Sequence, residues 1–205
     1  MKISHHELEN CYTNPAIWAR KRIKNNVSDF IRRGYDGSIK LAIFAFHKTE
    51  DEKYAKSKLS SYLSNFTSVR RIKEAEDTFR KYINWYEAEK PIVVQTRVRL
   101  NIDIDFDNIL SGEVSRVDIK RDMGYRGILI GSIPRHWSDQ IRMPLIQFGL
   151  AQIFKRRQDE IEVGWQDLSG KPFYSRCYKE KEINIAFERV RNLSRSIYEE
   201  IIAHT

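Results

Sequence analysis

The sequence contains little of the residue types that mark several specialised classes of protein. Its 205 residues include two cysteines, five prolines and nine glycines. Cys11 and Cys177 lie far apart and outside any CxxC spacing, which argues against a zinc site and against a disulfide scaffold. We therefore expect two free thiols, in a chain whose composition is typical of a globular protein.

Long apolar runs are absent as well. The longest, at 41–46 and 128–130, fall far short of the roughly 20 residues that a membrane helix needs. Residues 1–7 contain no apolar stretch before a small-residue cleavage site, so we expect no secretory signal, a cytoplasmic location and no membrane partner. The length fits one buried core, and we expect a single domain over residues 1–205.

Positive charge, by contrast, is in excess. The sequence has 36 lysines and arginines against 28 acidic residues, which gives a formal net charge of +8 at pH 7. Short basic clusters are spread along the chain at 20–24, 32–33, 70–73 and 155–157. This balance favours nucleic acid or another polyanion as a partner, although each cluster alone is equally consistent with a solvated helix face.

The first part of the chain, residues 1–90, has mainly helical patterns. Ser4 and Glu7 have the spacing of a capping box, which predicts a helix from Ser4, and Asn14–Pro15 predicts the start of a second helix. Residues 38–89 then predict a mostly helical stretch that Pro91 ends.

The second part, residues 91–205, has the patterns of a sheet with helices. Apolar and polar residues alternate over 97–106, which predicts a long strand with one buried face. Further strands at 113–119 and 127–133 complete a meander, and a helix after Pro134 is expected to cross them. The last predicted elements are a hairpin over 161–177 and an amphipathic helix.

Three stretches of sequence resemble one family of nucleases. Ile3–Trp18 resembles the opening of RecB-type and CRISPR-exonuclease domains, with Asn14 in place of a cysteine before the proline. The stretch Gly112–Asp118, G-E-V-S-R-V-D, is similar to the family strand G-x-[IV]-D-R-[IV]-D at all but one position, and Trp137–Leu145 resembles the glutamine-bearing helix that follows the catalytic strand. The chain thus resembles a PD-(D/E)XK nuclease domain over nearly its whole length.

The resemblance implies both a fold and a site. The fold is α/β, with a restriction-endonuclease-like core of a mixed central sheet flanked by helices and an N-terminal helical part. In this family, a carboxylate from the first strand motif and one from a following [ED]-x-K strand hold a divalent metal, and the lysine positions or activates water.

The residues at the corresponding positions do not suit that chemistry. Ser115 stands at the first aspartate position, Gly131 and Ile133 stand where the second carboxylate and the lysine belong, and Gln95 stands for a supporting glutamate. Because these side chains cannot hold magnesium, we expect a degenerate site with no catalytic residue, no metal and no cofactor.

Other residues leave alternatives open. On the family's helical histidine pattern, Lys40 takes the expected position, with His47 two turns further along the helix. Asp103, Asp105 and Asp107 alternate on one strand and could bind a metal, but a solvated face is favoured because no lysine or histidine accompanies them. His136 follows the third strand, in a loop where family members touch substrate, but a capping or packing role is favoured for it.

The sequence therefore predicts a catalytically inactive nuclease-like protein that binds nucleic acid, with DNA favoured. It would act as a subunit of a DNA-processing or defence machinery, beside a protein partner such as a helicase or nuclease subunit. Expected phosphate contacts are Arg20, Arg22, Lys24, Arg116 and Arg142, while Trp18, Trp137 and Trp165 could stack on bases or serve as core anchors.

Three alternatives remain at this stage. Arg116 borders a buried strand and could pair with Asp118 or Glu113 instead of a phosphate. The whole protein could be a structural subunit that docks a partner enzyme without touching nucleic acid. It could also be a divergent metal-dependent nuclease.

Overall fold

The structure, a computed structural model, describes residues 2–24, 34–105 and 108–203, except for the side chains of residues 20–24. The helices and strands follow one another along the chain as β1 (Lys2–Ser4), α1 (Leu8–Thr13), α2 (Pro15–Lys24), α3 (Tyr35–Thr49), α4 (Glu52–Leu63), α5 (Val69–Glu89), β2 (Ile92–Asp105), β3 (Asn108–Ile119), β4 (Tyr125–Ile130), α6 (Arg142–Phe154), β5 (Ile161–Gln166), β6 (Phe173–Arg176) and α7 (Glu180–Ile202).

The strands of the described chain form one mixed sheet of six, in which β3 has the most neighbours. β2 pairs antiparallel with one edge of β3 along its whole length. On the other edge, β1 pairs parallel with residues 109–111 and β4 pairs antiparallel with residues 116–119. β5 then joins β4 in parallel, and β6 joins β5 antiparallel. The sheet therefore forks along β3, between β1 and β4.

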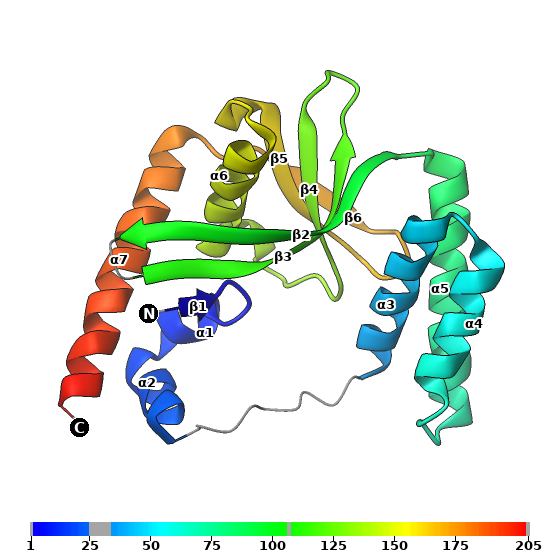
Figure 1. The fold of residues 1–205 in the computed structure, drawn as a ribbon, viewed down its shortest axis with the longest axis horizontal. Helices are drawn as coiled ribbons and strands as arrows, with labels where there is room; N and C mark the ends of the chain where they lie inside the picture. Colours follow the sequence, from blue (N-terminus) through cyan, green and yellow to red (C-terminus); the bar gives the residue numbers. More distant parts are fainter. Residues whose placement is uncertain (1, 25–33, 106–107, 204–205) are drawn as a thin grey trace.

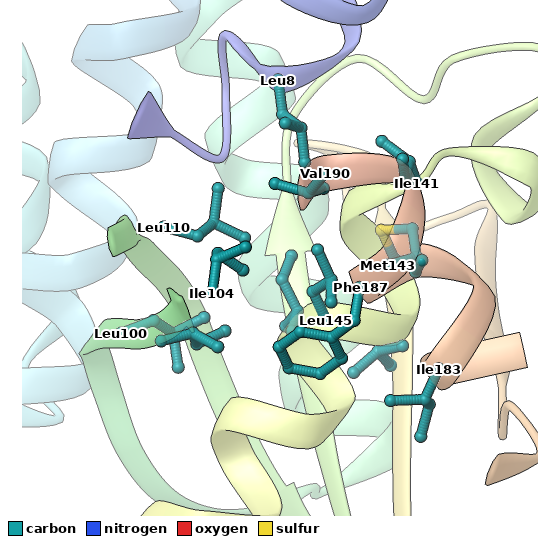
Figure 2. Close-up of a cluster of buried hydrophobic side chains, with 14 of the residues drawn as sticks. Leu8, Leu100, Ile104, Leu110, Ile141, Met143, Leu145, Ile183, Phe187 and Val190 are labelled. Atoms are coloured by element: carbon teal, nitrogen blue, oxygen red, sulfur yellow. The ribbon is translucent and has the colours of Figure 1, made fainter. Parts of the chain in front are cut away.

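Helices cover both faces of this sheet, as Figure 1 shows. α6 and α7, with α1 and α2, enclose the larger hydrophobic core against one face. Because strand side chains alternate between faces, the even-numbered residues of β2 from Val98 to Ile104 are buried and their neighbours are exposed. Figure 2 shows Leu100 and Ile104 beside Leu145 and Phe187, which α6 and α7 contribute.

The opposite face carries a second core under α3, α4 and α5. Ile128 and Ile130 of β4 pack there with residues such as Phe79 of α5. Polar caps begin two of these helices, since Asp51 accepts a hydrogen bond from the Tyr54 amide at 3.0 Å and Ser68 accepts one from the Arg71 amide at 3.4 Å. No helix in the described ranges is long and apolar enough to cross a bilayer.

Most of the predicted elements are present: the helical stretch before Pro91, the β2–β4 meander, the β5–β6 hairpin and the closing helix. The helix predicted from Ser4 is wrong. Residues 2–4 form β1, and α1 begins at Leu8, because the sheet offers β3 as a partner for this main chain. The third strand ends at Ile130 rather than at 133, since Gly131 turns the chain at φ 153°.

Candidate functional site

The fork of the sheet brings the start of the chain against the middle of β3. Residues 112–115 lie between the stretches that pair with β1 and β4, so the described strands leave this edge open. His5 fills it. Its amide donates to the Ser111 carbonyl at 2.7 Å, and its Nε2 lies 3.1 Å from both the amide nitrogen and the carbonyl oxygen of Glu113. Depending on its tautomer, Nε2 either accepts from this amide or donates to this carbonyl, so a side chain satisfies one of the main-chain groups that a strand would otherwise pair.

Gly112 makes room for this imidazole. A Cβ at that position would lie 1.6 Å from Cδ2 of His5, so any larger residue would displace the ring. His5 is 1% exposed, and burial, together with the neighbouring His6, lowers its pKa to about 3. The ring is therefore neutral at neutral pH. Its Nδ1 is buried with no hydrogen-bond partner in the described part of the chain.

Ser115 and Gly131, which the sequence placed at the two metal-ligand positions, come together at this fork. Ser115 is fully buried, and its Oγ accepts a hydrogen bond from the Ile130 amide at 3.1 Å. Gly131 follows directly, and its amide donates to the Gln166 carbonyl at 3.0 Å. The serine hydroxyl therefore ties β3 to β4, at the position that the sequence resemblance aligns with a metal-binding aspartate.

The other two positions that the resemblance singled out lie on separate elements. Gln95 is exposed on β2, opposite Val117 of β3. Ile133 follows β4 and packs, half-buried, against the larger core. Ser115 and Gly131 are thus linked through the contact of β3 with β4, while Gln95 lies on β2 and Ile133 lies beyond β4, and none of the four side chains is a carboxylate.

Two cations flank the fork instead. Nε of Arg97 lies 3.0 Å from Oε2 of Glu113, and its guanidinium lies 5.5 Å from the centre of the Phe44 ring. Arg97 has φ 56°, a left-handed backbone conformation that side chains other than glycine seldom adopt. Lys40 of α3 is half-buried, and this burial lowers its pKa while Glu113 opposes the shift. Lys40 has no ion-pair partner among the described residues.

Arg116 does not reach the surface, contrary to its expected role as a phosphate contact. It is fully buried, and its Nε and Nη2 donate to the two carboxylate oxygens of Asp118 at 2.7 and 2.8 Å. Nη1 donates to the Tyr82 hydroxyl at 2.5 Å, and the guanidinium lies 4.9 Å from the centre of the Trp85 ring. The charge is neutralised within the fold, as the alternative pairing with Asp118 predicted.

Arg142 is also inside the protein rather than at a surface that meets phosphate. It is 6% exposed, it donates from Nε to Oε1 of Gln140 at 2.9 Å, and its guanidinium lies 5.3 Å from the centre of the Trp165 ring. The remaining expected contacts, Arg20, Arg22 and Lys24, belong to α2, but their side chains lie outside the described residues.

The aspartates considered as a metal site lie on β2, away from the fork. Asp103 and Asp105 are exposed, Asp105 accepts a hydrogen bond from Nδ2 of Asn108 at 2.6 Å, and Asp107 lies outside the described residues. Within the described ranges, no three histidine, cysteine or acidic side chains are grouped as metal ligands.

The histidines and tryptophans singled out from the sequence have diverse surroundings. Nε2 of His47 lies 2.7 Å from the Tyr82 hydroxyl, and burial, aided by Arg116, lowers the pKa of His47 to about 3. His136 is exposed, 3.9 Å from Asp139, and therefore does not pack. It stands at the N-cap of the short helix Trp137–Asp139, but its side chain makes no capping hydrogen bond to the described residues. Trp165 is 8% exposed and is a core anchor, while Trp18 and Trp137 are half-buried and pack against the same core.

His5 and Arg97 were not predicted from the sequence as neighbours of β3. His5 lies 108 residues before Glu113 in the chain, a separation that no local pattern spans. The one local signal was Gly112, because a glycine within a strand often marks the close approach of another group.

Comparison with known proteins agrees with the fold. No family model matches the chain, and no curated protein matches it. A crystal structure described as "Putative exonuclease" from Eubacterium rectale is similar over 100% of this chain and 82% of that chain, with a TM-score of 0.58 at 9% sequence identity. The structure of SSO0001 is a weaker match, with a TM-score of 0.30 at 8% identity over 86% of this chain and 83% of that chain. The chain therefore has a nuclease-like fold: a mixed α/β core with a central sheet flanked by helices.

Proposed function

We propose that the protein holds the phosphate backbone of nucleic acid at the fork of β3 without cutting it. One observation carries this proposal. Ser115, which the sequence resemblance aligns with a metal-binding aspartate, is a buried hydroxyl bonded to the main chain, while Lys40 and Arg97 supply positive charge beside it. The site combines features suited to binding a phosphate with a ligand set unsuited to hydrolysis.

Hydrolysis of nucleic acid and binding of its phosphates need different side chains. Hydrolysis on this frame relies on a hard divalent cation, which needs several oxygen ligands, at least some of them carboxylates. Binding needs only cations near the phosphate, and lysine and arginine provide these directly. Glu113 pairs with Arg97, so a phosphate at the fork competes with Glu113 for the guanidinium. Lys40, which has no such competitor within 4 Å in the described chain, is the first contact.

Nucleic acid, with DNA favoured, is the ligand class that this proposal adopts. The formal net charge of +8 supports it, and so does the fold shared with a protein described as a putative exonuclease. We further propose that the chain acts as a subunit of a DNA-processing or defence machinery, beside a helicase or nuclease partner. That wider role rests on the sequence resemblance.

The test compares two lysines of the same helix. Lys40→Glu changes the cation at the fork, and Lys48→Glu makes the same charge change at an exposed position near the end of α3. Binding of short, fluorescently labelled single-stranded and duplex DNA is measured by anisotropy at low salt. We expect Lys40→Glu to weaken binding by about tenfold or more, and Lys48→Glu by less than about threefold. Equal effects of the two variants, both folded, would remove the fork from the interface.

A further inference from the structure

A cavity of about 1250 Å³ opens away from the fork, beyond the buried pair Arg116–Asp118. Its walls come from the end of α5, the start of β2, the β3–β4 turn and the segment before β6. This volume exceeds the roughly 300–1,000 Å³ that is usual for small-molecule sites. Three acidic residues line the cavity, against six cationic ones. The cationic residues are Lys90, Arg116, Lys120, Arg121, Arg126 and Lys171.

The deepest charges of this cavity are already paired. Arg116 and Asp118 neutralise each other at 2.7 Å, and the exposed fraction of Arg116 is 0%. The Arg116 guanidinium lies over the Trp85 ring, which also lines the cavity. The floor is therefore a fixed, neutral unit, and it does not provide the charge that would attract an anion.

The surplus positive charge lies at the rim, because only some of the cations there have acidic partners. Lys171 lies 2.9 Å from Glu89, while Lys120 and Arg126 lie 2.8 and 3.0 Å from Glu162. Across the described residues, Lys90 and Arg121 have no ion-pair partner. An anion in the cavity would therefore meet these two side chains without displacing a carboxylate.

The ammonium group of Lys90 extends from a fixed stretch of backbone that also carries exposed apolar side chains. Lys90 ends α5 with φ 46°, and its amide donates to the Tyr86 carbonyl at 2.9 Å, so its position is fixed. Ile92, two residues further on, is 64% exposed and lines the same cavity together with Pro91 and Phe173. A ligand with an apolar part next to its negative charge would cover this surface while it meets Lys90. Nucleotides combine both, a base and a phosphate.

We propose that this cavity binds phosphate-bearing nucleotide units, with phosphate at Lys90 and Arg121 and a base against the surface of Ile92 and Pro91. The units come either from a single strand or from free mononucleotides. The strand as a source rests on the function proposed above, and it would place a second contact beyond the fork. The cavity itself stands on its own residues and does not depend on the fork.

The test uses a pair of variants with equal charge change. Lys90→Glu/Arg121→Glu alters the rim of the cavity, and Lys181→Glu/Arg195→Glu alters two exposed positions on α7. The two probes are a short single-stranded DNA, followed by anisotropy, and adenosine monophosphate, followed by quenching of tryptophan fluorescence. Trp85→Phe removes the reporter inside the cavity, and thermal melting checks that each variant is folded.

Each outcome separates the two proposals. We expect the rim variant to weaken DNA binding by about tenfold or more, while the control changes little. The slope of log affinity against log salt concentration should become shallower by about 1.4, because each of the two lost phosphate contacts contributes about 0.7. If DNA does not bind the wild type but the mononucleotide quenches a signal that Trp85→Phe and the rim variant both lose, the cavity binds free nucleotides and the proposed function fails. If the rim variant responds to both probes like the control, or neither probe binds the wild type, the inference is overturned.

Discussion

At the scale of single residues, the main feature is the buried ion pair of Arg116 and Asp118. Both side chains are buried, and two hydrogen bonds join the guanidinium to the carboxylate. Tyr82 takes a further guanidinium N–H and itself lies 2.7 Å from His47, so the pair belongs to a network that joins β3 to α3 and α5. Removing one charge of such a network leaves the other uncompensated in a poorly solvated place.

We expect Asp118→Ala to lower the free energy of unfolding by about 3–5 kcal/mol, because it strands the buried Arg116. Asp77→Ala is the matched control, since it breaks the exposed pair of Asp77 with Arg80 and should cost less than about 1 kcal/mol. Urea unfolding measures both variants. A cost for Asp118→Ala no larger than that of the control would show that Arg116 finds solvent or another partner.

His47 should make stability depend on pH. The folded protein lowers the pKa of His47 from 6.5 to about 3, so between these values the unfolded chain binds more protons than the folded one. Stability is therefore full above about pH 6.5 and falls as the pH drops. Between pH 7 and 4.5, the free energy of unfolding of His47→Gln, measured with urea, should fall by about 2–3 kcal/mol less than that of the wild type. Each pKa unit is worth about 1.4 kcal/mol. His136→Gln, at an exposed site, should follow the wild type, and an unchanged drop in His47→Gln would rule out this role.

The sequence could predict some of these residues and not others. Arg116 and Asp118 are two positions apart on a strand and so share a face, which made their pairing a stated alternative. The burial of Arg142 could not be predicted, because its partners include the main chain at His5, 137 residues away. Distant contacts of this kind leave no periodic signal in the sequence.

At the scale of elements, long periodic segments were predictable and short ones were not. β2 alternates over many residues, and α3 to α5 have helical patterns that end before Pro91. β1 has three residues, too few for a period, and it exists because β3 has a free edge beside it. The fork was therefore missing from the prediction, together with the position of His5 within it.

The packing of His5 on Gly112 predicts a non-additive pair of substitutions. Gly112→Ala should destabilise the wild type by about 1–3 kcal/mol, because the new methyl group occupies the space of the imidazole. In a His5→Ala background, the same change should cost less than about 1 kcal/mol. A double-mutant cycle from urea unfolding gives the coupling, and additive costs would mean that Gly112 matters for another reason.

At the scale of the whole molecule, we predict that the protein binds nucleic acid without cleaving it. With magnesium or manganese, we expect labelled DNA and RNA to stay intact on sequencing gels, because Ser115 and Gly131 offer no carboxylate to a metal. The control protein replaces Asp103, Asp105 and Asp107 with alanine. Robust metal-dependent cutting by the wild type that this variant lacks would establish the divergent nuclease instead.

The fold places the two proposed contacts on opposite sides of the buried network of Arg116. The fork lies at residues 112–115, and the cavity opens beyond Asp118 toward the β3–β4 turn. A nucleic-acid strand that touched both the fork and the cavity would extend along several residues of β3, each of which spans about 3.3 Å. Longer strands should then bind more tightly than those too short to span both, if one strand uses both contacts.

The most direct test of the central claim is the affinity of the wild-type protein for DNA and RNA, measured from low to physiological salt. Binding through phosphates releases counterions, so the logarithm of the affinity should fall linearly with the logarithm of the salt concentration and depend little on sequence. We predict a steep slope for single strands, in a protein that leaves its ligand intact. If the folded wild type shows no binding even at low salt, nucleic acid is not its ligand, and the interpretation as a docking subunit replaces this account.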